Sequence, residues 1–247
     1  MTGSVPTDPG QVALRPTKLG TADGTFTVRR FRPTPQPKRT LIILDDELIG
    51  DAMIAAARLR AIDGSLPDTE LLLVGFGDAH YGSLHQRRGA SFTFAQCDLS
   101  LVGIETTGSA SQLSGFLREQ VLPQCQSDIG LVGYSLSGLF AIDAIGALDG
   151  RCSYLAALSP SLWLDQTAED RLAQRLAEDD DLRVFLGVGE SEDDPIPGDE
   201  LSMQARVSGL GEELGHRFGE RALVEVYAAA DHSSVVLHAA DRAILEF

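Results

Sequence analysis

Lysine is nearly missing from this chain of 247 residues, where it occurs only as Lys18 and Lys38. The chain has 20 basic residues against 36 acidic ones, so its formal net charge is −16 and arginine carries most of the positive charge. An anionic surface of this kind repels nucleic acids and acidic membranes, so we expect neither as a partner. The charge by itself is typical of a solvated protein surface.

Cysteine and long hydrophobic runs are also scarce. The three cysteines are far apart in the sequence, and an odd number at wide spacing argues against a disulfide framework or a metal site. The chain contains no apolar run of the roughly 18 residues that a membrane-spanning helix needs. Its first residues lack the basic start and apolar stretch of a secretory signal, so we expect a cytoplasmic protein.

Short apolar runs alternate with helical patterns along most of the chain. We predict strands at 25–32, 40–44, 71–76, 129–134, 154–158, 184–189 and 222–227, and helices at 50–61, 111–124, 138–148, 170–176, 200–218 and 234–247. Alternation of this type predicts crossover connections around a mostly parallel sheet flanked by helices, which is the α/β class. Residues 1–24 have no clear period and are predicted to form a flexible arm before one domain, 25–247.

Two local predictions concern the helical and loop segments of the first half. In the helix at 50–61, we expect Met53, Ala57 and Leu59 to point toward the core. The polar segment 87–95 is predicted to be a loop.

The segment Gly133-Tyr134-Ser135-Leu136-Ser137-Gly138 follows a buried strand and leads directly into a helix. A sharp turn between strand and helix would expose the hydroxyl of Ser135, and small neighbouring residues let the backbone segments approach each other. The segment departs from G-x-S-x-G because Ser137 occupies the second glycine position. A plain turn with a capping serine is the alternative, but the position between strand and helix favours a nucleophile.

A serine nucleophile needs a general base, and His232 is the best placed of the five histidines. It lies between the last predicted strand and the last predicted helix, where a side chain reaches the tip of the sheet. His80 and His85 precede the serine, whereas His216 and His238 fall in helical patterns. We therefore predict His232 as the base, with a structural loop histidine as the alternative.

The carboxylate that orients this histidine is expected after the strand 184–189. Glu192 is favoured, and the rivals left open are Glu190, Asp193, Asp194 and the more distant Asp165. For the oxyanion hole, the backbone N–H of Leu136 is one expected donor. The second is expected just after the strand 40–44, at the N–H of Asp46 or Glu47.

Together, five segments resemble the esterase family of α/β-hydrolases that includes siderophore trilactone esterases, esterase D with its S-formylglutathione hydrolases, and mycolyltransferases. They are Leu44-Asp45-Asp46, the Ser135 segment, Ser159-Pro160-Ser161-Leu162-Trp163, Gly187-Val188-Gly189-Glu190-Ser191-Glu192 and Asp231-His232-Ser233-Ser234-Val235. The likeness runs from about residue 40 to the end. It implies an α/β-hydrolase fold, a catalytic Ser135 and His232 with Glu192 as the acid, and no metal or organic cofactor.

The resemblance also implies residues that bind substrate. Arg87 and Arg88 stand near the place of arginines in these relatives and are candidates to bind an anionic or catecholate group, with a solvated loop pair as the alternative. Trp163 is a candidate wall of the pocket, with a core or rim tryptophan as the alternative. Asp46 departs from the pattern, because relatives usually have glycine there.

Three functions are carried forward from the sequence. The first is hydrolysis of a carboxylic ester or lactone through an acyl-enzyme on Ser135, with a small-molecule ester, lactone or thioester as substrate. The second is transfer of the same acyl group to another acceptor, as in an acyltransferase, a thioesterase or a macrocycle-forming enzyme. The third is a binding module that keeps the α/β-hydrolase fold without catalysis. Oligomeric state is left open.

Overall fold

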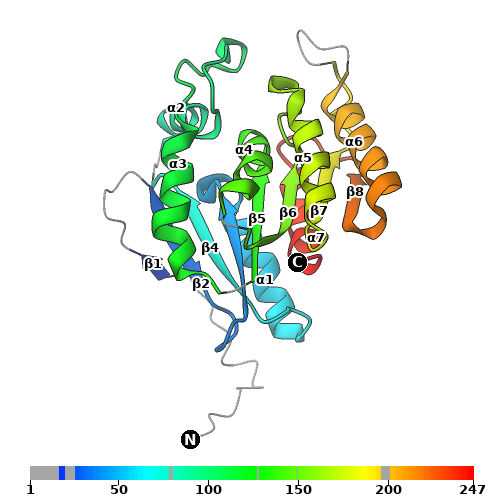
Figure 1. Ribbon diagram of the computed structural model, residues 1–247. Helices are drawn as coiled ribbons and strands as arrows, with labels where there is room; N and C mark the ends of the chain where they lie inside the picture. Colours follow the sequence, from blue (N-terminus) through cyan, green and yellow to red (C-terminus); the bar gives the residue numbers. More distant parts are fainter. Residues whose placement is uncertain (1–16, 20–25, 78–79, 127, 149, 196–200) are drawn as a thin grey trace, which may run out of the picture.

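An eight-stranded sheet lies between two layers of helices in the computed structural model, which describes residues 17–19, 26–77, 80–126, 128–148, 150–195 and 201–247 (Figure 1). The strand order is β1-β2-β4-β3-β5-β6-β7-β8. The strands are β1 (Thr17–Leu19), β2 (Thr27–Phe31), β3 (Arg39–Leu44), β4 (Thr69–Gly75), β5 (Asp128–Tyr134), β6 (Cys152–Leu158), β7 (Arg183–Gly189) and β8 (Ala222–Tyr227). The pairs from β4 to β8 are parallel, whereas β1 and β2 join the β4 edge in antiparallel pairs.

The helices divide the buried side chains into two cores, one on each face of the sheet. They are α1 (Asp51–Asp63), α2 (Tyr81–Phe92), α3 (Ala110–Phe116), α4 (Leu136–Ala144), α5 (Thr167–Glu178), α6 (Met203–Phe218) and α7 (Val235–Leu245). Helices α1 and α7 contribute buried residues to one core, and α2 to α6 contribute to the other. Because both faces are covered, central strands such as β3 and β5 consist almost wholly of buried residues.

The sheet confirms the predicted α/β class, and each predicted strand and helix has an observed counterpart, with one or both ends shifted in all but β8. The prediction of a loop at 87–95 is wrong over most of its length, because α2 extends through Phe92. Leu59 was expected to point inward but is 65% exposed, since Met53, Ile54 and Ala57 form the inner face of α1.

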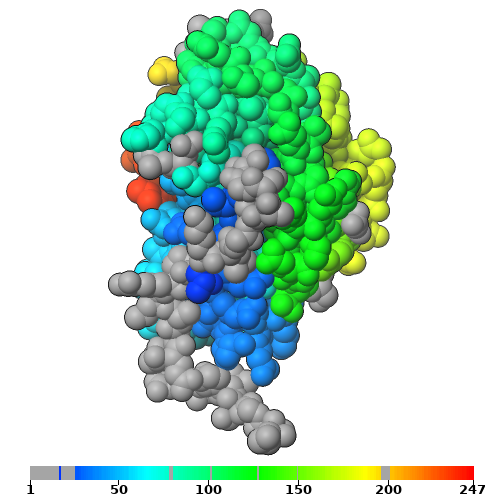
Figure 2. All heavy atoms as spheres, turned by 90° about the vertical axis from the view of Figure 1, so that its left-hand side faces the viewer, coloured from blue at the N-terminus to red at the C-terminus, as the bar shows by residue number. Residues whose placement is uncertain are grey.

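The predicted N-terminal arm lies mostly outside the described residues. Its described part, Thr17–Leu19, forms β1 and pairs with β2 at the sheet edge. Figure 2 faces this edge of the sheet, and there α2 and α3 form the surface beside the edge strands. Among the described helices, none is long and apolar enough to cross a bilayer. Cys152 is buried, whereas Cys97 and Cys125 are half-buried, and all three are free.

Candidate active site

Ser135 occupies a strained turn between β5 and α4. Its φ is 57° and its ψ is −118°, a backbone conformation that costs a non-glycine residue energy. The turn requires small neighbours: a Cβ on Gly133 would lie 2.2 Å from the carbonyl oxygen of Ser137, and one on Gly138 would lie 3.1 Å from Pro160. The close packing lifts Ser135 onto the tip of the sheet, where it lines a pocket.

Ser137 stabilises this turn through its hydroxyl, a contact that the glycine usual at this position could not make. Its hydroxyl accepts the N–H of Tyr134 at 2.8 Å and lies 2.9 Å from the Tyr134 carbonyl, to which it donates. Ser137 is fully buried, so it is a structural member of the turn. Of the two serines in this segment, Ser135 is among the described residues that line the pocket and Ser137 is not.

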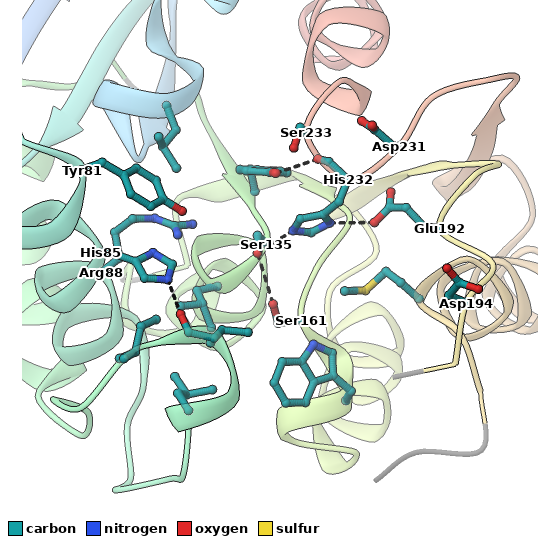
Figure 3. Close-up of a pocket in the computed structure, with 18 of the residues that line it drawn as sticks. Tyr81, His85, Arg88, Ser135, Ser161, Glu192, Asp194, Asp231, His232 and Ser233 are labelled. Atoms are coloured by element: carbon teal, nitrogen blue, oxygen red, sulfur yellow. Dashed lines mark hydrogen bonds and ion pairs between the residues drawn. The ribbon is translucent and has the colours of Figure 1, made fainter. Parts of the chain in front are cut away.

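His232 reaches Ser135 from the loop between β8 and α7. Its Nε2 lies 3.0 Å from the Ser135 hydroxyl, and its Nδ1 lies 2.6 Å from Oε2 of Glu192 (Figure 3). The serine, the imidazole and the carboxylate thus form one hydrogen-bonded chain, with members from the ends of three different strands. A neutral imidazole that donates from Nδ1 accepts at Nε2, which is the tautomer a general base needs.

Glu192 is held on its other oxygen by two further donors. Oε1 accepts the hydroxyl of Ser159 at 2.6 Å and the N–H of Gly189 at 2.8 Å. Burial favours the neutral carboxyl, but the hydrogen bonds from His232, Ser159 and Gly189 outweigh it, so the pKa of Glu192 lies below its usual value. The carboxylate is therefore ionised at neutral pH and fixed in orientation.

The rival carboxylates lie elsewhere in the structure. Glu190 accepts the N–H of Ala229, and Asp165 binds Thr167 and Arg171. Asp193 is exposed, and Asp194 stands at the rim of the pocket. Only Glu192, of the candidates named from the sequence, contacts His232 in the described structure.

Leu136 is the first residue of α4, so its N–H has no carbonyl partner within the helix and lies at the positive end of the helix dipole. Asp46 begins a π-helical turn, Asp46–Gly50, that follows β3. Its side chain binds Arg29 with a distance of 2.6 Å between Oδ2 and Nε. Leu48 of the same turn lines the pocket. An oxyanion donor at the N–H of Asp46 stays a prediction.

The structure separates the two arginines that were expected to bind substrate. Arg88 lines the pocket but is only 4% exposed, and its Nε contacts both carboxylate oxygens of Asp45, at 2.9 Å and 2.8 Å. Arg87 is not among the described lining residues and donates to the carbonyl of Phe76. The Arg88 charge is therefore already balanced by Asp45, which weakens the expectation that it binds an anion.

Replacing Arg88 by methionine is expected to destabilise the fold strongly. Burial raises the pKa of Asp45 and Arg88 opposes that rise, so the variant leaves an unpaired buried carboxylate at a cost of about 3–5 kcal/mol. An acid whose folded pKa lies above its unfolded pKa loses stability as pH rises between the two values. The deficit in unfolding free energy should therefore be larger at pH 8 than at pH 5.

Urea denaturation of Arg88→Met at both pH values measures this deficit. Arg217→Met is the matched control, because Arg217 pairs with Glu213 at 3.0 Å on the exposed surface of α6. Its loss should cost only about 0.3–0.5 kcal/mol at either pH. An equal deficit for the two variants would show that the buried pair does not stabilise the fold.

The pocket around Ser135 has a volume of about 640 Å³ and combines apolar walls with an acidic rim. Trp163 lines it, together with residues to which the sequence assigned no role: Leu48, Tyr81, His85, Leu99, Val102, Ile104, Tyr134, Ser161, Ser191, Met203, Asp231 and Ser233. Ser161 places its hydroxyl 3.4 Å from that of Ser135. Figure 3 shows Tyr81, His85 and Arg88 on one side of Ser135, and Glu192, Asp194 and Asp231 on the other. Within the described residues, no cluster of acidic, histidine or cysteine side chains is arranged to hold a metal ion.

No family model matches the sequence, and no curated protein matches it. Solved structures do match. The BES protein from Bacillus cereus is 20% identical with a TM-score of 0.73, over 94% of this chain and 93% of that chain. Siderophore hydrolase EstA from Aspergillus nidulans is 19% identical with a TM-score of 0.71, over 99% and 97%. An IroE-like serine hydrolase from Shewanella oneidensis is 18% identical with a TM-score of 0.69, over 94% and 78%.

These similarities cover 94–99% of this chain. At identities of 20% or less they bear on the fold and not on the reaction. The chain shares the α/β fold of these solved structures.

Proposed function

We propose that this protein is a serine hydrolase that cleaves a carboxylic ester or lactone through an acyl-enzyme on Ser135. The observation that carries the proposal is the continuous hydrogen-bonded chain from Ser135 through His232 to Glu192, with distances of 3.0 Å and 2.6 Å. A positioned base next to a serine, itself oriented by a carboxylate, is the arrangement that activates a serine hydroxyl. The names of similar structures, a siderophore hydrolase and a serine hydrolase, support a hydrolase.

Acylation would begin when the Ser135 oxygen attacks the substrate carbonyl carbon and His232 takes the hydroxyl proton on Nε2. The carbonyl oxygen becomes an oxyanion, which the N–H of Leu136 at the start of α4 would stabilise, with the N–H of Asp46 as the expected second donor. The carbon–oxygen bond to the alcohol then breaks, and His232 gives its proton to the leaving alkoxide. Glu192 stays ionised and stabilises the imidazolium in between.

Deacylation would repeat these steps with water. His232 removes a proton from a water molecule as its oxygen attacks the acyl carbon, and the second tetrahedral intermediate uses the same oxyanion donors. The bond to Ser135 breaks, the serine oxygen recovers a proton from His232, and a carboxylic acid leaves. The apolar walls formed by side chains such as Leu99, Ile104 and Trp163 favour a substrate with an apolar or aromatic acyl group.

A panel of p-nitrophenyl esters tests the proposal. We expect saturable release of nitrophenol, with acyl groups that fill the apolar part of the pocket giving the highest kcat/KM. Preincubation with a fluorophosphonate should abolish turnover, because the reagent transfers its phosphonyl group to an activated serine and releases fluoride. Release no faster than that produced by the heat-denatured protein, across the panel, would contradict the proposed activity.

A further inference from the structure

Tyr134, the last residue of β5, connects the strand that carries the nucleophile to the loop that carries the base. Its phenol donates a hydrogen bond to the backbone carbonyl of His232 at 2.6 Å. Its ring lies 5.1 Å from the imidazole, centroid to centroid, with 33° between the planes. The two residues are 98 positions apart in sequence, and Tyr134 is only 8% exposed. This contact therefore fixes a loop on a buried anchor.

Two other hydrogen bonds of the loop that carries His232 go to the segment that follows β7. The N–H of Ser191 donates to the carbonyl of Ala230 at 2.9 Å, and Glu190 accepts the N–H of Ala229. These bonds hold the loop against the segment after β7, which also carries Glu192. They fix the base relative to the acid and make no direct hydrogen bond to β5. Among the described contacts, the Tyr134 phenol is the hydrogen bond that joins the His232 backbone to β5.

We propose that Tyr134 is a positioning residue that holds the His232 backbone so that Nε2 stays within hydrogen-bond distance of the Ser135 hydroxyl. This inference rests on the proposed serine hydrolase function. The imidazole needs such an anchor, because its side chain is 42% exposed and solvent surrounds much of the ring. The phenol suits the task over a wide pH range, since burial raises its pKa above the usual value and keeps the O–H protonated.

The substitution Tyr134→Phe removes the phenol oxygen and keeps the ring. A displacement of the base by a fraction of an ångström to 1 Å should lower kcat with p-nitrophenyl esters roughly 10- to 100-fold and leave KM nearly unchanged. The rate of fluorophosphonate labelling should fall by a similar factor, because the reagent also requires an activated serine.

Tyr154→Phe is the matched control. Tyr154 is also buried, and its phenol donates to the backbone carbonyl of Ala243 in α7 at 2.9 Å, away from the pocket. Both variants leave a backbone carbonyl without its phenol donor, part-buried at His232 and buried at Ala243, so both should lower the Tm. Only Tyr134→Phe should lower kcat. An equal loss of kcat in the two variants, or an unchanged kcat in Tyr134→Phe, would overturn the positioning role.

A double variant separates action through the base from a general structural effect. If Tyr134 acts by placing His232, then Tyr134→Phe should have no further effect on the residual activity of His232→Ala. Additive losses would contradict the proposal. The two proposals fail differently: wild type that is never labelled by fluorophosphonate overturns both, whereas labelled wild type with equally fast labelling of Tyr134→Phe overturns the positioning role alone.

Discussion

Ser135→Ala should remove essentially all ester hydrolysis while leaving the fold intact. The substitution deletes the oxygen that lies 3.0 Å from Nε2 of His232, so no acyl-enzyme can form. In serine hydrolases with such a triad, loss of the nucleophile lowers kcat by as much as about 10⁶-fold, and binding plus oxyanion donors leave a residual rate. Steady-state kinetics on p-nitrophenyl esters measures the loss, and His232→Ala should produce a loss of similar size.

The control for this substitution is the second serine of the same segment. Ser137→Ala removes the hydroxyl that pairs with the backbone N–H and carbonyl of Tyr134, so it should cost about 1–3 kcal/mol of stability. It should still hydrolyse esters and react with fluorophosphonate, since Ser137 does not line the pocket among the described residues. Activity retained by Ser135→Ala and abolished in Ser137→Ala would reverse the assignment of the nucleophile.

Glu192→Gln should lower kcat by about 10³- to 10⁴-fold although it changes only one atom of the side chain. Oε1 of Glu192 accepts from Ser159 and Gly189, so the glutamine carbonyl would take that position and direct its amide nitrogen toward His232. The amide nitrogen is a donor, so Nδ1 must accept and the imidazole proton moves to Nε2. An imidazole protonated at Nε2 cannot accept the proton of Ser135.

Asp193→Asn is the control for the carboxylate, because it makes the same chemical change on the next, exposed residue. Its kcat should stay within about twofold of wild type, as expected for a surface substitution. KM should change little in either variant, since neither substitution removes an apolar wall of the pocket. Full activity in Glu192→Gln would mean that Ser135 and His232 work as a pair without an acid.

The sequence predicted the parts of the site that depend on local chain geometry. A buried strand followed at once by a small-residue turn and a helix predicts the tight turn observed at Ser135, where a Cβ on Gly133 would collide with the Ser137 carbonyl and one on Gly138 would press against Pro160. His232 and Glu192 were predicted from their positions after predicted strands, since the carboxyl ends of parallel strands meet at one edge. The choice of Glu192 over its rivals needed the structure, because all of them follow β7 except Asp165.

Helix α2 was missed because its buried face is not apolar. Arg88 and Gly89 lie on that face beside Leu84 and Phe92, so the hydrophobic period that marks a helix is broken. The arginine at position 88 tolerates burial because it pairs with Asp45, which lies 43 residues away in sequence. Gly89 is needed for close packing, since a Cβ there would lie 2.7 Å from the carbonyl oxygen of Thr106. Both reasons depend on tertiary contacts that no local pattern contains.

The positions of Tyr134 and Ser159 in the site were also beyond local prediction. Tyr134 contacts a backbone carbonyl 98 residues away, and Ser159 contacts Glu192 over 33 residues. Ser159 has a φ of 41°, which is unusual for serine and has no sequence signal of its own. Hydrogen bonds of this kind join the ends of different strands, so they become visible only when the sheet order is known.

Mass spectrometric mapping of the fluorophosphonate adduct tests the central claim most directly. Wild-type protein is labelled under native conditions and digested, and the peptide that carries the phosphonyl group is sequenced. The account predicts one adduct, on Ser135, formed slowly or not at all in His232→Ala. An adduct on Ser137 or Ser161, or no adduct on the folded protein, would contradict it.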